Sequence, residues 1–349
     1  MRTRRTLPFD VIDALIDLRL GWAAEPLEHW RALGSPIPAG RVGRLDRGWS
    51  TVLVDAAGTV ERVRNIGADV AVGDFVVLSD DRERVATVLE RHSAFVRRAS
   101  FDGQRAESHT LAANIDVVML VHALGAPPNQ RRLERELVLA WDSGARPVVV
   151  LTKTDLVETA EIEAAVSSLG DVAPGVDVLA ASGITGDGVE RLRGYSSGTS
   201  TIALLGASGV GKSTLVNALV GHTRQATAAV REGDQRGRHT TIAAELVPLP
   251  GSGWLIDTPG VRAVSLWSSG RGIERAFADV FDLMDHCRFR DCKHDTEPDC
   301  AVNSAVAAGT LDVRRLESMK RLVAEEAAIE DEQRAREKSM DRRGMRRPR

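Results

Sequence analysis

The stretch that decides the fold is Gly206-Ala207-Ser208-Gly209-Val210-Gly211-Lys212-Ser213, a complete match to the phosphate-binding loop G-x-x-x-x-G-K-S. The apolar run Thr201–Leu205 precedes it, and a predicted helix, Ser213–Val220, follows it. In this setting the backbone N–H groups of the loop face a phosphate at the helix N-terminus. We expect Lys212 to contact the β- and γ-phosphates of a nucleotide and Ser213 to ligate Mg²⁺, with Thr214 completing the site.

A second motif, Thr152-Lys153-Thr154-Asp155, follows the apolar run Pro147–Leu151 and matches the base-reading pattern Asn/Thr-Lys-x-Asp. Asp155 can accept hydrogen bonds from guanine N1–H and from the 2-amino group, a pair that adenine cannot provide. The motif therefore favours GTP over ATP. Thr152 replaces the more usual Asn, and we expect its shorter side chain to lower base affinity. Ser182-Gly183, after the predicted strand Val178–Ala180, is expected to place its backbone against the guanine.

A third motif, Asp257-Thr258-Pro259-Gly260, is typical of the switch that binds Mg²⁺ through Asp257 and senses the γ-phosphate near Gly260. The segment Arg236-Gly237-Arg238-His239-Thr240-Thr241 lies before it. Either Thr240 or Thr241 can supply the hydroxyl that a first switch needs, and the sequence does not choose between them.

Val261 stands where Ras-like proteins place a water-orienting Gln, and an apolar side chain cannot orient water. We therefore expect slow GTP hydrolysis by the chain alone and a need for another group. His239 is the candidate for positioning the water, because it lies next to the switch threonines.

The order of these motifs is unusual, because Thr152–Asp155 precedes the phosphate loop instead of following it and Asp257–Gly260. This order indicates a circularly permuted GTP-binding domain. Asp257–Gly260 becomes its last motif, so the switch runs almost directly into the C-terminal region. Loss of the γ-phosphate is then expected to reorient that region and its RNA contacts.

The three cysteines of the chain lie together in the pattern Cys287-x4-Cys292-x-His294-x5-Cys300. Three thiolates and one imidazole suit tetrahedral Zn²⁺ in a closed structural site, whereas a catalytic site keeps an open position. We predict one structural zinc ion. His286, next to Cys287, is an alternative ligand.

Hydrophobic runs divide the chain into five predicted segments. Short β runs at Ser50–Val54, Thr59–Arg64, Phe75–Leu78 and Val85–Leu89 suggest a small barrel of the OB type. From about residue 110, buried-strand patterns alternate with helices, as in a doubly wound α/β sheet. The predicted order is a helical lead-in (1–38), an OB-fold-like RNA-binding barrel (39–100), the circularly permuted P-loop GTPase domain (101–270), a zinc-binding helical domain (271–330) and a basic tail (331–349), which we expect to be disordered.

Net charge and apolar patterning indicate where the chain acts and what it can bind. The net charge of −3 gives no overall case for nucleic acid, so any basic surface must be local. No apolar stretch is long enough for a membrane span, and no signal-peptide pattern follows the basic N-terminus. We expect a cytoplasmic protein with no membrane partner, and a monomer. The OB-type segment offers a nucleic-acid surface, with candidate contacts at Arg41, Arg44, Arg47, Arg62, Arg64, Arg97 and Arg98.

Taken together, the permuted order, the Gly-Arg-His-Thr-Thr switch, Asp-Thr-Pro-Gly followed by an apolar residue, and the Cys/His spacing resemble the bacterial small ribosomal subunit biogenesis GTPase RsgA family. The resemblance covers roughly residues 39–325. It implies an N-terminal OB-fold, a permuted G domain and a C-terminal zinc-binding helical domain. It also implies a late role in assembly of the small ribosomal subunit, contact with its rRNA, and GTP hydrolysis stimulated by that subunit. Thr152, Gly183 and the basic tail depart from the family pattern.

Two other functions remain open at this stage. The absence of a water-orienting Gln is compatible with a non-hydrolysing, GTP-sensing, RNA-binding adaptor. The Cys/His cluster is compatible with a zinc-delivery GTPase, which would require an exchangeable metal with an open coordination position. An ATPase is disfavoured by Asp155.

Overall fold

The structure is a computed structural model that describes residues 16–33, 38–98, 108–125, 129–221, 244–251, 253–257 and 271–344. The chain divides into two compact units. The first unit comprises Met1–Pro128, Ser143–Gly170 and Val176–Ser265, and the second comprises Asn129–Asp142, Asp171–Gly175 and Leu266–Arg349. Within these described ranges, no helix combines the length and the apolar character that a membrane crossing requires.

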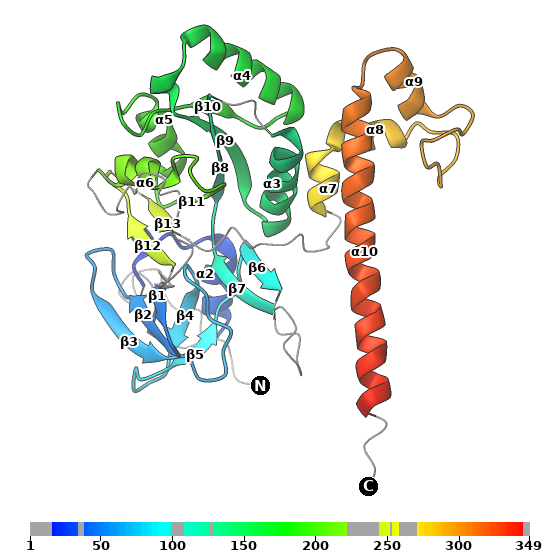
Figure 1. Ribbon diagram of the computed structural model, residues 1–349. Coiled ribbons are helices and arrows are strands. Elements are labelled where there is room, and N and C mark those ends of the chain that lie inside the picture. The colour runs from blue at the N-terminus through cyan, green and yellow to red at the C-terminus, as the bar shows by residue number, and fades with distance from the viewer. Residues whose placement is uncertain are drawn as a thin grey trace, which may run out of the picture. The chain divides into compact units, whose positions relative to one another are not determined.

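A five-stranded barrel of the OB type occupies the N-terminal part of the first unit (Figure 1). Its strands are β1 (Ala39–Asp46), β2 (Trp49–Leu53), β3 (Val60–Arg64), β4 (Phe75–Leu78) and β5 (Val85–Val88). β1 pairs antiparallel with both β2 and β4, and an isolated bridge between Arg64 and Arg84 closes the barrel. Its core consists mainly of valines that alternate inward along the strands, such as Val52 on β2 and Val63 on β3. The predicted barrel is confirmed, with β1 as an additional strand.

Short elements flank the barrel on both sides in sequence. The lead-in contains η1 (Leu18–Leu20) and α2 (Ala24–Ala32), and a separate two-stranded sheet pairs β6 (Ala94–Arg98) with β7 (Ser108–Ala113). Hydrogen bonds anchor the lead-in to the rest of the unit: Trp254 Nε1 donates to the Arg19 carbonyl at 3.0 Å, and the Glu90 N–H donates to His29 Nδ1 at 3.0 Å. The first unit therefore includes the lead-in as a packed element.

The nucleotide-binding part of the first unit is a sheet in the order β10-β9-β8-β11-β13-β12, parallel except for β12. Its strands are β8 (Val117–Ala123), β9 (Arg146–Thr152), β10 (Val178–Ala180), β11 (Thr201–Gly206), β12 (Glu245–Pro248) and β13 (Trp254–Asp257). The strand order reverses between β8 and β11, which is where ligands bind in open α/β sheets. The doubly wound fold predicted from the sequence is confirmed.

Helices and short turns connect these strands. In the first unit they are η2 (Thr154–Leu156), most of α4 (Thr159–Val172), α5 (Val189–Arg193), η3 (Gly194–Ser196) and α6 (Lys212–Val220). Leu192 of α5 and Leu219 of α6 are fully buried in the core that the inward side chains of β8, β9, β11 and β13 form. This packing fixes α6, and with it the loop that precedes it, against the sheet.

The barrel and the nucleotide-binding sheet are continuous. β12 pairs with β13 on one side and with β1 on the other, where Arg44 lies opposite Glu245. Among the described residues, eleven strands consequently belong to one sheet.

Arg41 on β1 is the polar centre of this junction, and the prediction that it contacts RNA is wrong. Its side chain is fully buried and donates to the carbonyls of Leu20 (2.7 Å), Gly73 (3.2 Å) and Asn114 (3.0 Å) and to Thr201 Oγ1 (2.8 Å). Burial lowers the pKa of Arg41 to about 10, while nearby Asp116 and Asp74 favour its charged form. The guanidinium therefore stays charged at neutral pH and joins the lead-in, the barrel and β11.

We expect Arg41→Met to destabilise the first unit by about 2–5 kcal/mol, because four buried acceptors would lose a charged donor. Denaturant unfolding measures this change. The matched control is Arg44→Met on the same strand, where the side chain is exposed. An exposed substitution is expected to change stability by at most about 0.5 kcal/mol. Equal effects of the two variants would contradict the bridging role.

The second unit is helical. It contains α3 (Gln130–Ser143), α7 (Arg271–Ala276), α8 (Ala278–Met284), α9 (Ala301–Ala307) and α10 (Val313–Gly344). Buried Arg315 of α10 joins its own helix to α7, α8 and the end of α4. It donates to both carboxylate oxygens of Asp279 and to the carbonyls of Val172 (2.8 Å) and Ala276 (2.6 Å), and its guanidinium lies over the ring of Phe277. These contacts pack α7 and α8 against the start of α10.

The long α10 differs from the prediction of a disordered tail. Residues 331–344 continue the helix, which in Figure 1 extends well beyond α7, α8 and α9. The segment contains four Arg and two Glu, which favour helix, and Arg334 pairs with Glu330 one turn earlier at 3.2 Å. Residues 345–349 lie outside the described part of the chain.

Candidate functional site

The phosphate loop lies where the sequence placed it, between β11 and α6. Gly206 ends β11, and a Cβ there would lie 2.4 Å from the Val121 carbonyl oxygen on neighbouring β8, so only glycine fits. α6 begins at Lys212, whose Nζ donates to the Gly206 carbonyl at 2.8 Å and to that of Ala207. The lysine ammonium and the first N–H groups of α6 therefore face the same loop, which suits a bound phosphate.

The base motif is bonded directly to this loop. Thr152 is the last residue of β9, and its hydroxyl lies 2.5 Å from the Val210 carbonyl oxygen and 3.1 Å from that of His122. Thr152 is buried, so these contacts form away from water. The shorter side chain that replaces Asn thus links two motifs that are far apart in sequence. This contact could not be predicted, because no feature of the sequence indicates that Val210 is the partner.

Asp155 is oriented by the loop that follows β10. Ser182 Oγ donates to Asp155 Oδ1 at 2.6 Å and accepts from the backbone N–H groups of Ile184 and Thr185, both at 3.1 Å. Lys153 has a left-handed backbone (φ 63°), which is uncommon for a residue with a Cβ and turns the chain so that Asp155 follows in η2. The two segments predicted to read the base therefore meet through a side-chain hydrogen bond.

Gly183 packs against α6 so closely that an alanine side chain does not fit. A Cβ at Gly183 would lie 2.9 Å from the carbonyl carbon and oxygen of Thr214 and 3.0 Å from the Leu215 nitrogen. These are backbone atoms, so an added methyl group would displace either the loop or the start of α6.

We expect Gly183→Ala to weaken GTP binding at least about fivefold, because overpacking costs ~1–3 kcal/mol and here strains both walls of the site. Titration with a fluorescent GTP analogue measures the effect. Gly170→Ala in α4 is the control, since nothing lies within 4 Å of a Cβ there. If Gly183→Ala bound GTP as tightly as wild type, the close contact between this loop and α6 would have no effect on GTP affinity.

Asp257 ends β13, which runs parallel to β11 with Ile256 opposite Ala203. This register places Asp257 at the same edge of the sheet as the phosphate loop, with Ser213 in the first turn of α6. A carboxylate and a hydroxyl are hard oxygen ligands, so this donor set fits Mg²⁺. The remaining predicted switch residues lie outside the described part of the chain: His239, Thr240, Thr241, Thr258, Pro259, Gly260 and Val261.

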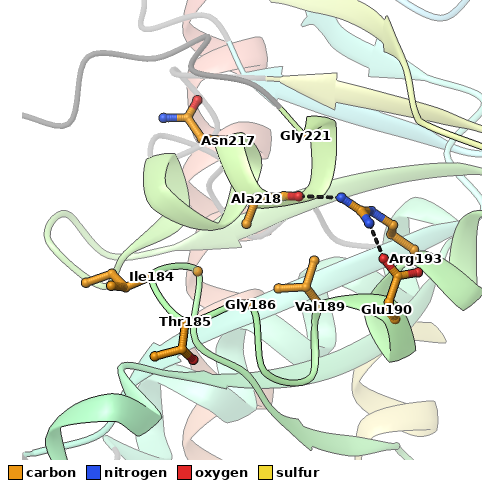
Figure 2. Close-up of a pocket in the computed structure, with 10 residues that line it drawn as sticks. Ile184, Thr185, Gly186, Val189, Glu190, Arg193, Asn217, Ala218 and Gly221 are labelled. Atoms are coloured by element: carbon orange, nitrogen blue, oxygen red, sulfur yellow. Dashed lines mark hydrogen bonds and ion pairs between the residues drawn. The ribbon is translucent and has the colours of Figure 1, made fainter.

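A pocket of about 450 Å³ lies beside the predicted base loop. Figure 2 shows it between that loop (Ile184, Thr185), α5 and α6, with Arg193 bonded to the Ala218 carbonyl at 2.6 Å and paired with Glu190. Gly183 belongs to its lining, whereas Asp155 and the phosphate loop do not. The pocket is therefore a neighbour of the nucleotide site and separate from the phosphate position.

The four predicted zinc ligands converge in the second unit. Cys287, Cys292, His294 and Cys300 place their ligand atoms within 4.8 Å of one another. His294 Nδ1 lies 3.6 Å from Cys287 Sγ and 3.5 Å from Cys300 Sγ, and the two sulfurs are 3.9 Å apart. Tetrahedral Zn²⁺ with Zn–S bonds of about 2.3 Å requires S···S edges of about 3.8 Å. The donor set and its spacing fit one zinc ion, and His286 is not part of the cluster because its Nδ1 bonds to the Asp282 carbonyl instead.

Residues around the cluster orient its ligands. Burial lowers the pKa of His294, with a further contribution from Lys320, and so favours the neutral imidazole that a metal requires. Lys320 on α10 donates to the His294 carbonyl at 2.9 Å, and the Asn303 N–H donates to Cys300 Sγ at 3.4 Å. Lys320 carried no signal in the sequence, since its partner is a backbone carbonyl 26 residues away.

Comparison with known proteins shows which family this chain belongs to. The family model "RsgA GTPase" matches residues 88–267. A Streptomyces coelicolor protein named small ribosomal subunit biogenesis GTPase RsgA is 42% identical over 316 residues, covering 86% of this chain and 85% of that protein. A Methanosarcina acetivorans protein of the same name is 39% identical over 313 residues, covering 87% of this chain and 84% of that protein.

Solved structures agree on the fold. The crystal structure of YjeQ from Thermotoga maritima has a TM-score of 0.62 at 26% identity, with 83% of this chain and 98% of that chain covered. YloQ, described as a circularly permuted GTPase, has a TM-score of 0.60 at 23% identity and shows the fold alone, with 84% and 96% covered. The chain belongs to the RsgA GTPase family.

Proposed function

We propose that this chain is a GTP-hydrolysing, RNA-binding switch that acts in late maturation of the small ribosomal subunit, with hydrolysis stimulated by that subunit. The observation that carries the proposal is the contact between Thr152 and the Val210 carbonyl, which joins the base motif to the phosphate loop at the carboxyl edge of the sheet. The names of the relatives, small ribosomal subunit biogenesis GTPase, support the small subunit as the partner.

Each residue of the site has a proposed task. Asp155, held by Ser182, accepts from guanine, and the backbone at Gly183 borders the base. Lys212 and the N–H groups of 206–213 bind the phosphates, and Ser213 and Asp257 hold Mg²⁺, which neutralises phosphate charge when it is bound with GTP. We propose that Thr240 or Thr241 completes the first switch and that His239 positions the attacking water.

The zinc site has a structural task in this proposal. Cys287, Cys292, His294 and Cys300 would supply all four ligands of one ion, with no carboxylate and no open position, and such a closed set argues against zinc delivery. The ion would hold the α8–α9 connection, whose position a switch in the nucleotide site could change. We also propose a monomer that works in the cytoplasm, where ribosomal subunits mature.

The adaptor hypothesis makes a different prediction about turnover. Val261 cannot orient water. If no other group positions the attacking water, the chain would bind GTP without hydrolysing it. Membership in a GTPase family favours hydrolysis, and we propose that the small subunit supplies or orders the group that Val261 does not provide.

Co-sedimentation with purified small ribosomal subunits tests the proposed partner. We expect the chain to pellet with small subunits in the presence of a non-hydrolysable GTP analogue, and to pellet much less with GDP. Large subunits and the Lys212→Ala variant are the controls. Equal pelleting with small and large subunits would contradict a small-subunit switch. So would pelleting that is the same with the GTP analogue and with GDP.

A further inference from the structure

Three charged residues form one row across β13, β12 and β1, which are neighbouring strands of the sheet (Figure 1). Glu245 of β12 pairs in register with Asp257 of β13 on one side and with Arg44 of β1 on the other, and both pairings are antiparallel. Residues directly opposite each other on antiparallel strands share one face of the sheet, with Cβ atoms about 4.5–5.5 Å apart. Glu245 therefore lies between a second carboxylate and an arginine.

The two carboxylates lie on the face of the sheet that α6 covers. Val247 of β12 and Leu255 of β13 are buried in the core that includes Leu215 of α6. Side chains two residues apart along a strand point to the same face, so Glu245 and Asp257 share this face. Both are half-buried, and both lie at the edge of the sheet where the phosphate loop leads into α6. Glu245 is consequently a neighbour of the position proposed for Mg²⁺.

Two adjacent carboxylates are unfavourable unless a cation offsets their charge. Like charges directly opposite each other on neighbouring strands destabilise a sheet. Arg44 can offset one negative charge, but it is exposed, and exposed ion pairs contribute little. Both carboxylates are offset when Asp257 holds a divalent ion. The arrangement therefore favours the state in which the nucleotide is bound together with Mg²⁺.

We propose that Glu245 is a positioning residue for the Mg²⁺ that accompanies GTP. Its carboxylate adds a second negative charge beside Asp257 and accepts hydrogen bonds from the waters that Mg²⁺ keeps in protein sites. This inference rests on the proposed function for the Mg²⁺ site at Ser213 and Asp257. It adds a residue of β12 that raises the affinity of that site for the ion.

The proposed role depends on the charge of Glu245 and not on its shape. Glutamine has nearly the same shape and keeps an oxygen that can accept a hydrogen bond from Arg44, but it is neutral. Glu245→Gln should therefore preserve the strand pairing and lose the effect on Mg²⁺. In the absence of Mg²⁺ a second carboxylate repels the phosphates of the nucleotide. The variant should then bind nucleotide at least as tightly as wild type.

The Mg²⁺ dependence of nucleotide binding tests the proposal on the full-length, zinc-loaded protein. Binding of a fluorescent, non-hydrolysable GTP analogue is followed as MgCl₂ is added to buffer freed of Mg²⁺ by ion exchange, because a chelator would also remove zinc. We expect Glu245→Gln to raise the Mg²⁺ concentration at half-maximal binding about tenfold, since loss of a group that orients metal ligands lowers metal affinity by this order.

Two control variants separate the effect of Glu245 from that of its surroundings. Glu61→Gln removes another half-buried glutamate, on β3 of the same sheet, which pairs with Arg82. It should leave the Mg²⁺ midpoint unchanged. Arg44→Gln removes the other neighbour of Glu245 and should not raise the midpoint. An equal rise in Arg44→Gln would mean that Glu245 acts on the barrel and not on the ion.

An unchanged Mg²⁺ midpoint in Glu245→Gln would overturn the proposal. Binding of the analogue that weakens by the same factor with and without Mg²⁺ would also overturn it, because a purely structural defect acts in both conditions. Asp257→Asn distinguishes this failure from failure of the proposed site. If Asp257→Asn raises the midpoint and Glu245→Gln does not, only the role of Glu245 is refuted. If neither variant raises it, the proposed Mg²⁺ site itself fails.

Discussion

The Cys292→Ser variant is expected to lose stoichiometric zinc and the ordered structure of residues 287–300. Apart from the cluster, this segment is held by polar contacts near the surface. Lys320 bonds to the His294 carbonyl and pairs with Asp295, Asn303 donates to the Asp295 carbonyl at 3.0 Å, and Arg288 pairs with exposed Asp299 at 2.8 Å. Structural zinc contributes about 10–16 kcal/mol of apparent binding free energy in small domains, far more than these contacts. Metal analysis of the purified protein and hydrogen exchange over α8 and α9 measure the two losses.

The control for zinc binding is His286→Asn, next to Cys287 in sequence but outside the cluster. It should keep one zinc ion per chain and normal exchange protection. One zinc ion per chain in Cys292→Ser would refute the ligand assignment. If both variants lost zinc, substitution anywhere in this segment would disrupt its fold, and the result would not identify Cys292 as a ligand.

The second large effect is expected at the base motif. Asp155→Asn should shift nucleotide preference from GTP toward XTP, because an amide can donate to the 2-oxo group of xanthine where the carboxylate accepted from guanine. Each charged hydrogen bond lost is worth about 1.5–3 kcal/mol, so GTP affinity should fall by about tenfold or more. Competition between GTP, XTP and ATP for the site measures the change.

Asp187→Asn is the matched control, since Asp187 is a nearby exposed carboxylate that accepts from Thr185 Oγ1 at 2.8 Å. It should leave the preference for GTP intact. An Asp155→Asn protein that still prefers GTP would mean that another group reads the base. In that case the bond from Ser182 to Asp155 would serve only to stabilise the loop.

The placement of the phosphate loop and the base motif at the ends of strands was predictable, because both motifs depend on local sequence. A phosphate loop requires a fixed pattern of glycine, lysine and serine, and apolar runs before Gly206 and Thr152 identify the strands that carry both motifs. The convergence of the four candidate zinc ligands was predictable for the same reason: three thiolates and one imidazole within fourteen residues have few other uses. Strands β4 and β10 appear with the predicted limits, Phe75–Leu78 and Val178–Ala180.

The features that were missed depend on distant partners. β1 is interrupted by Gly40 and Gly43, with an irregularity between Val42 and Arg44, so it shows no clean alternation of apolar and polar residues. In the sequence Arg41 is indistinguishable from a surface arginine, because its four acceptors, Leu20, Gly73, Asn114 and Thr201, come from distant parts of the chain. The helical tail was misjudged because its charge suggested disorder, whereas the spacing of those charges stabilises a helix.

GTP turnover with and without purified small ribosomal subunits, with large subunits as the comparison, tests whether the small subunit activates GTP hydrolysis by this chain. The chain alone should turn over slowly, and small subunits should accelerate it strongly, since an activating group supplied in trans is worth about 10³–10⁵ in rate. Lys212→Ala should show no stimulated turnover, which sets the background. Tight GTP binding by the wild-type chain without any acceleration by small subunits would contradict the switch and support the non-hydrolysing adaptor.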